Sequence, residues 1–117
     1  ATIPYGWITR NPFKSTFWAA QGMAAELSTG VLALLAVAGH NPSVAVILVG
    51  CSARFHKKAV GLTYFTCEEG DTLFRAVQRA IDTGESVEQT VTAEGTDKDG
   101  NPIATFEFTW SFKQRSK

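Results

Sequence analysis

One carboxylate stands apart from the other acidic residues of this 117-residue chain. Glu26 lies within the apolar stretch FWAAQGMAAELSTGVLALLAVAG at 17–39, and the next acidic residue is Glu68. Burying an unpaired carboxylate is costly, so a chain keeps one in its most apolar helix only where something offsets that cost. The position of Glu26 therefore predicts a role at a ligand site. The alternative is a carboxylate that Ser, Thr or a basic residue satisfies at a subunit interface.

A second group of candidate functional residues is basic. Arg54, His56, Lys57 and Lys58 form the one dense basic cluster of the sequence. Such a cluster either lies in a solvated loop or binds the phosphates of an anionic ligand. The point charges of lysines suffice for phosphate binding. His56 has no neighbouring Ser, Cys or Asp motif, so it does not by itself indicate catalysis.

Composition and charge narrow the class of protein. The chain is 44% hydrophobic and 19% charged, as in an ordinary soluble globule, and its length suits one domain, 1–117. Residues 1–59 carry a net charge of +4 and residues 60–117 a net charge of −4. This asymmetry is too mild for a nucleic-acid-binding protein, which usually carries a dense basic stripe. The asymmetry is compatible with a small anionic ligand that binds near the basic half of the chain.

The two cysteines indicate neither a disulfide framework nor a metal site. Cys51 and Cys67 lack metal-ligand spacing with His40 or His56, so we expect no bound metal and two buried thiols in a reduced cytoplasmic protein. The uncharged run at 27–39 is too short to span a bilayer, and no signal peptide is visible, so no membrane association is expected. We expect a further segment ahead of Ala1, because the chain begins inside an expected strand.

Hydrophobic periodicity and turn signals predict an α+β protein. A long helix should begin within residues 12–16, with Asn11 or Ser15 as its cap, and end near Ala38, before Gly39. A short helix should start at an Asp71 cap and end before Gly84. The expected strands span residues 2–9, 43–55, 62–67, 86–96 and 103–113.

The last expected strand suggests how these elements pack. Phe106, Phe108, Trp110 and Phe112 alternate with polar residues, which marks a sheet face packed against something large. The long helix is rich in Ala, Gly and Ser, so it can approach a sheet closely, and we expect it to be enclosed on most sides. The apolar run at 43–55 predicts a strand buried on both faces. The expected architecture is a largely antiparallel sheet wrapped around one long central helix, with a short extra helix.

Two segments resemble the hotdog-fold acyl-CoA thioesterases, especially the phenylacetyl-CoA type. Asn11 and Glu26 stand 15 residues apart, as do the Asn and the catalytic carboxylate of the family pattern, and Ala24-Ala25-Glu26 is similar to its Leu-Ala-Asp. The segment ARFHKKAVG at 53–61 is similar to a family strand segment that ends in Asn-Phe-Leu-Arg-Pro-Ala-x-x-Gly. The resemblance covers nearly the whole chain and is strongest to a bacterial branch described as thioesterases.

The resemblance implies hydrolysis of an acyl-CoA thioester at a site between two subunits of a homodimer or homotetramer. Glu26 would act as general base or nucleophile, and the backbone N–H of Trp18 would polarise the thioester carbonyl. Coenzyme A would enter as part of the substrate, and no separate cofactor is implied. Substrate contacts would come from Asn11, Gln21, Gly22, Arg54, His56, Lys57 and Lys58.

The sequence departs from the family where Phe17 and Trp18 replace a His and a Gly. Trp18 retains a backbone N–H, but its side chain would crowd the pocket or close its mouth. This departure favours an alternative function, a hotdog module that binds acyl-CoA or acyl carrier protein without turnover. An interaction domain with no small ligand is a third possibility.

Overall fold

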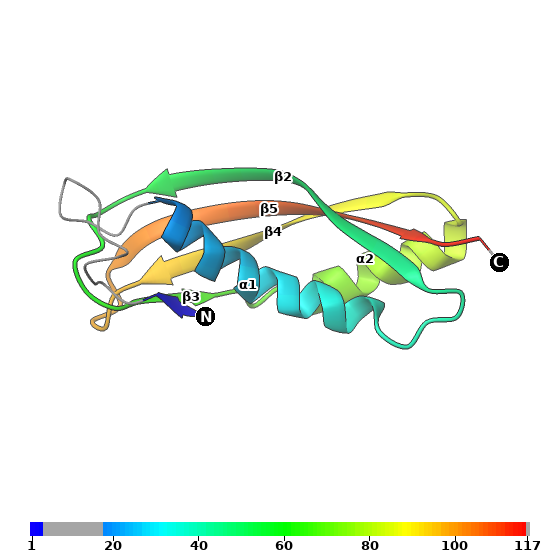
Figure 1. The fold of residues 1–117 in the computed structure, drawn as a ribbon, viewed down its shortest axis with the longest axis horizontal. Coiled ribbons are helices and arrows are strands. Elements are labelled where there is room, and N and C mark those ends of the chain that lie inside the picture. The colour runs from blue at the N-terminus through cyan, green and yellow to red at the C-terminus, as the bar shows by residue number, and fades with distance from the viewer. Residues whose placement is uncertain (4–17, 117) are drawn as a thin grey trace.

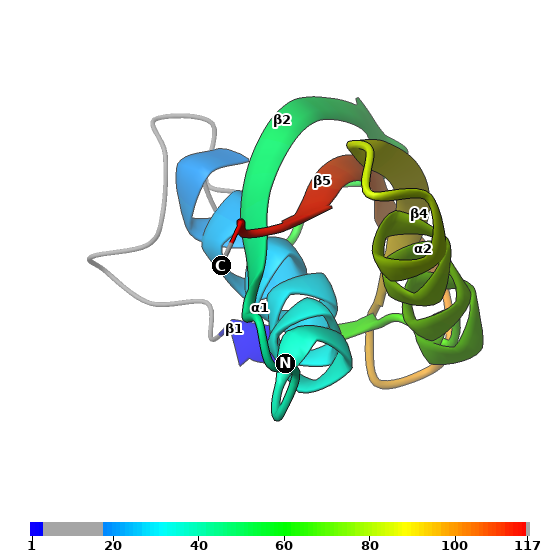
Figure 2. The same cartoon turned by 90° about the vertical axis from the view of Figure 1, so that its right-hand side faces the viewer.

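A five-stranded antiparallel sheet curls around one long helix (Figures 1 and 2). The computed structural model describes residues 1–3 and 18–116, and the strand order is β1-β3-β4-β5-β2. The elements are β1 (Thr2–Ile3), α1 (Trp18–Val37), β2 (Val44–Phe55), β3 (Thr63–Thr66), α2 (Gly70–Thr83), β4 (Val87–Thr96) and β5 (Pro102–Gln114). The expected α+β architecture is confirmed. The expected start of the long helix, Asn11 included, and most of the expected first strand lie outside the described residues.

The core forms where the small side chains of α1 meet the aromatic face of β5. The buried positions of α1 carry small or polar side chains: Ala20, Gln21, Ala24, Ala25, Thr29, Ala33 and Ala36. Phe106, Phe108, Trp110 and Phe112 are buried opposite them, as their alternation predicts. Figure 2 shows β2, β5 and β4 arching over α1, with α2 beside it. Because alanine side chains are short, the helix axis can lie close to the concave face of the sheet.

The central helix is less enclosed than the sequence suggests. Its outward face exposes large apolar side chains, among them Met23 (69% exposed), Leu27 (58%) and Leu34 (62%). Glu26 is exposed on the same side. The expectation of a helix covered on most sides is therefore wrong for the single chain, because the sheet curls over only one side of α1.

The apolar strand β2 also differs from its expectation. It pairs with β5 at an edge of the described sheet, and the prediction of a strand buried on both faces is wrong, because only Val44 of its residues is fully buried. Ile47 (64% exposed) and Val49 (50%) are open to solvent. Cys51 is exposed and Cys67 only half-buried, so the prediction of two buried thiols is also wrong. A continuous apolar run identifies a strand but does not show whether a second strand lies beside it.

The short helix begins differently from its expected capping. Glu69 occupies the N-cap of α2, and Asp71 lies within the first turn without capping it. The Glu69 carboxylate instead accepts a hydrogen bond from the backbone N–H of Thr92 in β4, at 2.6 Å. Gly84 ends the helix in the left-handed conformation, with φ of 71°, as its position predicts.

Among the described residues, one helix is long and apolar enough to cross a membrane by length and composition. That helix is α1, and the central helix of a soluble protein passes the same test.

One buried hydrogen bond joins the central helix to the sheet. The indole Nε1–H of Trp110 in β5 donates to Thr29 Oγ1 in α1, at 3.2 Å, and the Thr29 hydroxyl donates to the backbone carbonyl of Glu26, at 3.0 Å. Thr29 is fully buried and Trp110 nearly so. Water therefore cannot easily replace the hydroxyl as a partner for the indole.

We expect Thr29→Val to lower the free energy of unfolding by about 1–3 kcal/mol, because it leaves the buried indole N–H without an acceptor at nearly unchanged volume. Thr29→Ser keeps the hydroxyl and serves as the control; it should lose only the smaller contribution of a buried methyl group. Urea denaturation measures both variants. Equal stability of Thr29→Val and the wild type would show that the hydrogen bond contributes nothing.

Candidate functional site

A groove of about 480 Å³ runs along α1 on its open side. Its lining comes from α1, β2 and β5, namely Met23, Glu26, Leu27, Gly30, Val31, Ala33, Leu34, Val46 and Trp110. This volume lies within the range of about 300–1,000 Å³ that is typical of small-molecule sites. Glu26 is the one ionisable side chain among these lining residues, and the others offer almost entirely apolar surface.

Helical spacing explains why the groove follows α1. Glu26, Gly30 and Leu34 are separated by four residues each, so they lie in a row on one face of the helix. The eight residues from Glu26 to Leu34 span about 12 Å of helix. The row thus has a carboxylate near one end and apolar side chains along the rest.

The Glu26 carboxylate lies at the edge of this groove, exposed to solvent in the single chain. The expectation that the Glu26 carboxylate is buried is therefore wrong for the single chain, because Glu26 lies on the open face of α1. Among the described residues, no hydrogen bond or ion pair engages the carboxylate. Partial burial, and then the negative charge of Glu26, raise the pKa of the Cys51 thiol in β2. Glu26 consequently lies close enough to β2 to act on that strand electrostatically.

The other predicted site residues of α1 lie outside the groove lining. Trp18 is 70% exposed, eight residues before Glu26 and thus about 12 Å along the helix axis. Gln21 is buried in the core. A Cβ atom on Gly22 would lie 3.7 Å from the ring of Phe106, so Gly22 faces the sheet rather than opening space beside the carboxylate. Asn11 lies outside the described residues.

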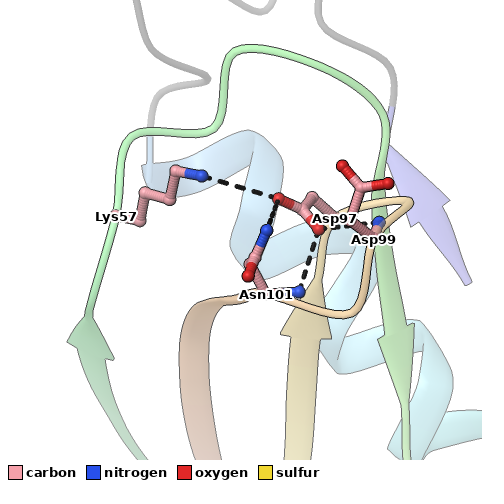
Figure 3. A network of polar contacts seen from close by, with 4 residues as sticks. All are labelled: Lys57, Asp97, Asp99 and Asn101. Atoms are coloured by element: carbon pink, nitrogen blue, oxygen red, sulfur yellow. Dashed lines mark hydrogen bonds and ion pairs between the residues drawn. The ribbon is translucent and has the colours of Figure 1, made fainter.

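Part of the basic cluster is engaged within the chain itself. Lys57 Nζ lies 3.6 Å from Asp97 Oδ2, in the turn between β4 and β5 (Figure 3). Asp97 accepts hydrogen bonds from the backbone and side-chain nitrogens of Asn101, at 2.9 and 3.0 Å, and from the Asp99 backbone N–H, at 2.9 Å. These contacts, chiefly those with Asn101, hold the pKa of Asp97 below its usual value. The ionised carboxylate thus ties Lys57 to the turn.

The remaining basic residues lie at the same end of the sheet. The His56 ring Nε2 is 2.9 Å from Thr105 Oγ1. Arg54 pairs in register with Thr105, so it shares the convex face of the sheet, opposite to the aromatic face that packs on α1. Arg54 and Lys58 are exposed. Figure 1 shows that β2 ends beside the beginning of α1, so the cluster lies at the Trp18 end of the helix rather than along the groove.

Sequence reasoning missed most of the groove. Gly30 and Leu34 could have been found from Glu26, because they follow it at four-residue intervals on a helix face. Val46 and Trp110 could not, because their place opposite α1 depends on the pairing of β2 with β5 across more than 50 residues of sequence. Trp110 appeared in the sequence only as one member of an aromatic core face.

A second hollow, of about 450 Å³, lies over β3 and β4 and is polar. Thr and Glu residues line it: Thr66, Glu68, Glu69, Thr92, Glu94 and Thr96. Among the described residues, no group of three or more His, Cys, Asp or Glu side chains is arranged to hold a metal ion. The apolar groove beside Glu26 is therefore the better candidate for an organic ligand.

Solved structures share this fold. No protein-family model and no curated protein matches the chain. A Pseudomonas aeruginosa protein of unknown function, described as a "Probable Thioesterase", is 19% identical with a TM-score of 0.82, over 97% of this chain and 74% of that one. A Chlorobaculum tepidum protein of unknown function is 12% identical with a TM-score of 0.77, over 97% and 75%.

A third similar structure contains coenzyme A. It is a Bacillus halodurans protein crystallised with CoA, 11% identical with a TM-score of 0.61, over 95% of this chain and 64% of that one. At these identities the likeness concerns the fold. The present chain has the hotdog fold, which is the fold that the resemblance of its sequence implies.

Proposed function

We propose that this protein hydrolyses acyl-CoA thioesters, with the acyl group in the groove along α1 and Glu26 at the reacting carbonyl. The observation that carries the proposal is a single carboxylate at the edge of an apolar groove, in a hotdog fold. The thioesterase description of the Pseudomonas protein and the coenzyme A of the Bacillus protein agree with this chemistry. Coenzyme A enters as part of the substrate, and the reaction as proposed uses no separate cofactor.

In the simplest mechanism Glu26 is a general base. Its carboxylate takes a proton from water as the water oxygen attacks the thioester carbonyl carbon, and the thiolate of coenzyme A leaves. Alternatively, the carboxylate attacks the carbonyl itself and water hydrolyses the resulting anhydride. A carboxylate without a partner among the described residues is available for either role. The backbone N–H of Trp18 lies about 12 Å from Glu26 along α1 of the same chain, so the proposed donor to the developing oxyanion is this N–H from the other subunit of a site between two subunits.

The basic cluster is the proposed contact for the phosphates of coenzyme A. Lys57 and His56 already have partners in Asp97 and Thr105, whereas Arg54 and Lys58 extend into solvent. We therefore assign the direct phosphate contact to Lys58 and Arg54. Lys57 would fix the connection that follows β2.

A second candidate function is acyl-CoA or acyl-carrier-protein binding without turnover. The observation in its favour is Trp18, whose large exposed side chain replaces the glycine of the thioesterase pattern. Binding of acyl-CoA with no release of free thiol would select this function over hydrolysis.

We further propose that two copies associate through the open side of α1 and the edge strand β2. The open side of α1 exposes Met23, Leu27 and Leu34, and the edge strand exposes Ile47 and Val49, of which Ile47 pairs with Ser111 and lies on the convex face of the sheet. Exposed apolar patches of this kind usually mark interaction sites, and the edge of β2 offers unpaired peptide groups to another strand. A second copy over this surface would roof the groove and shield Glu26 from bulk water.

The catalytic assignment predicts the behaviour of Glu26→Gln. This change keeps size and most hydrogen bonding but cannot accept a proton, so thioester hydrolysis should fall about 10²–10⁴-fold. Binding of acyl-CoA should barely change. Because Glu26 is exposed, the free energy of unfolding should shift by no more than about 0.5 kcal/mol. Thiol release across a panel of acyl-CoAs and thermal melting measure these effects.

Glu88→Gln, an equivalent change at an exposed position of β4, is the control and should hydrolyse at the wild-type rate. A Glu26→Gln protein that also hydrolyses at the wild-type rate would rule out Glu26 as base and nucleophile.

The assembly proposal predicts a dimer or a larger oligomer at micromolar concentration, measured by light scattering. Ile47→Lys combined with Val49→Lys should shift the population toward the single chain, because two charges would enter the contact. Phe74→Lys in α2 is the matched control, since Phe74 is 49% exposed but lies outside this surface. A wild-type protein that is monomeric at micromolar concentration would remove the model of a site roofed by a second copy.

A further inference from the structure

Gly30, which has no side chain, and the indole ring of Trp110 face each other at the floor of the groove. A Cβ atom on Gly30 would lie 3.7 Å from both Cη2 and Cζ2 of Trp110. That is an ordinary van der Waals distance, so a methyl group could be accommodated, but it would fill space that is now part of the groove. Gly30 therefore leaves the groove wider where it runs past the indole, and this stretch of the groove is called the passage below.

The indole cannot turn away to enlarge or close this passage. Trp110 Nε1–H is bound to Thr29 Oγ1, and the Thr29 hydroxyl is bound to the carbonyl of Glu26. The two hydrogen bonds connect the indole to the same helical turn that bears the carboxylate. These hydrogen bonds thus hold the indole against the backbone of the turn that bears Glu26.

The groove beyond Glu26 offers a ligand almost no hydrogen-bonding partner. Leu27, Val31, Ala33, Leu34 and Val46 line it, together with Gly30 and Trp110. The indole N–H, the one side-chain donor among these, is already bound to Thr29. A hydroxyl or carboxyl group on a ligand would lose its hydration here without compensation, which is expensive.

We infer that the groove selects unsubstituted hydrocarbon acyl groups and that Gly30 and Trp110 set the longest chain it accepts. The inference rests on the proposed function for the position of the thioester at Glu26. The chain runs from Glu26 along α1, passes Gly30 one helical turn later, about 6 Å on, and extends toward Leu34. Gly30 and Trp110 are specificity-determining residues and take no part in bond breaking.

This arrangement predicts how a side chain at position 30 changes ligand choice. A methyl group at Gly30 excludes carbons of the ligand that reach the passage and leaves those before it unaffected. Each methylene that loses its burial weakens binding by about fourfold. Gly30→Ala should therefore weaken long-chain ligands by about four- to twentyfold, and Gly30→Leu by more, with short chains retained.

The test is calorimetric binding of butanoyl-, hexanoyl-, octanoyl- and dodecanoyl-CoA to the full chain and its variants. In the wild type, affinity should rise with chain length. Gly30→Ala and Gly30→Leu should flatten that rise beyond the length at which the chain meets Trp110. Trp110→Phe removes part of the floor and should extend the rise to longer chains, so the two sites predict opposite shifts.

Two controls separate this effect from misfolding. Gly70→Ala adds a methyl group 3.6 Å from Leu32, at the start of α2 and away from the groove, and should bind every chain as the wild type does. Gly30→Ala should melt at or above the wild-type temperature, because alanine favours a helix interior more than glycine does. A weakened long-chain affinity in a protein of equal or greater thermal stability then reflects the groove.

The outcomes distinguish this inference from the proposed hydrolysis. Wild-type affinities in Gly30→Leu for all four chains would overturn the length limit while leaving hydrolysis intact. Equal affinity for octanoyl-CoA and a ω-hydroxyoctanoyl-CoA would overturn the hydrocarbon selectivity. Binding that strengthens with chain length but releases no thiol would support the inference about the groove and overturn the proposed hydrolysis. A wild-type protein that binds none of the four acyl-CoAs would overturn both proposals.

Discussion

Close packing between the small residues of α1 and the aromatic face of β5 determines how the rest of this molecule is arranged. Alanines at 24, 25, 33 and 36 let the helix lie directly against Phe106, Phe108, Trp110 and Phe112. Larger side chains at these positions would push the helix out of the curl of the sheet, at the cost of many dispersion contacts. Because the helix lies against the concave face of the sheet, one face of α1 is buried in the core. Any ligand must approach from the other face.

That other face is apolar as well, which is unusual for a helix on the surface of a single chain. It lies beside β2, whose edge is open and whose Val46 lines the groove together with residues of α1. The same residues thus bear on assembly and on ligand binding. A partner that covers this surface would lower the local dielectric around Glu26 and strengthen every electrostatic interaction that the carboxylate makes there. The cost of its charge, absent in the single chain, would then arise only on assembly.

The sequence predicted the features that depend on local pattern. The alternation in β5, the small-residue helix, the glycine ends of both helices and the isolation of Glu26 were all visible in it, and the fold followed from these. Features that depend on distant partners were not visible. The run at 43–55 has the same apolar character whether or not other parts of the protein cover both of its faces, and the cap of α2 was misplaced because Glu69, not Asp71, occupies it. Nothing local marks Trp110 as the residue that faces Gly30.

A single turn of α1 connects these observations. Glu26 and Gly30, four residues apart on one helix face, both line the groove, and Thr29, about 60° around the helix from Glu26, is buried in the core. The Thr29 hydroxyl joins the backbone of Glu26 to Trp110, so two hydrogen bonds connect the turn that bears the carboxylate to the floor of the groove. A displacement of β5 relative to α1 would move Trp110 with respect to Glu26 and Gly30. The alignment of a thioester at Glu26 with an acyl chain at Gly30 therefore depends on the core packing itself, and core variants that shift β5 should disturb long-chain ligands before short ones.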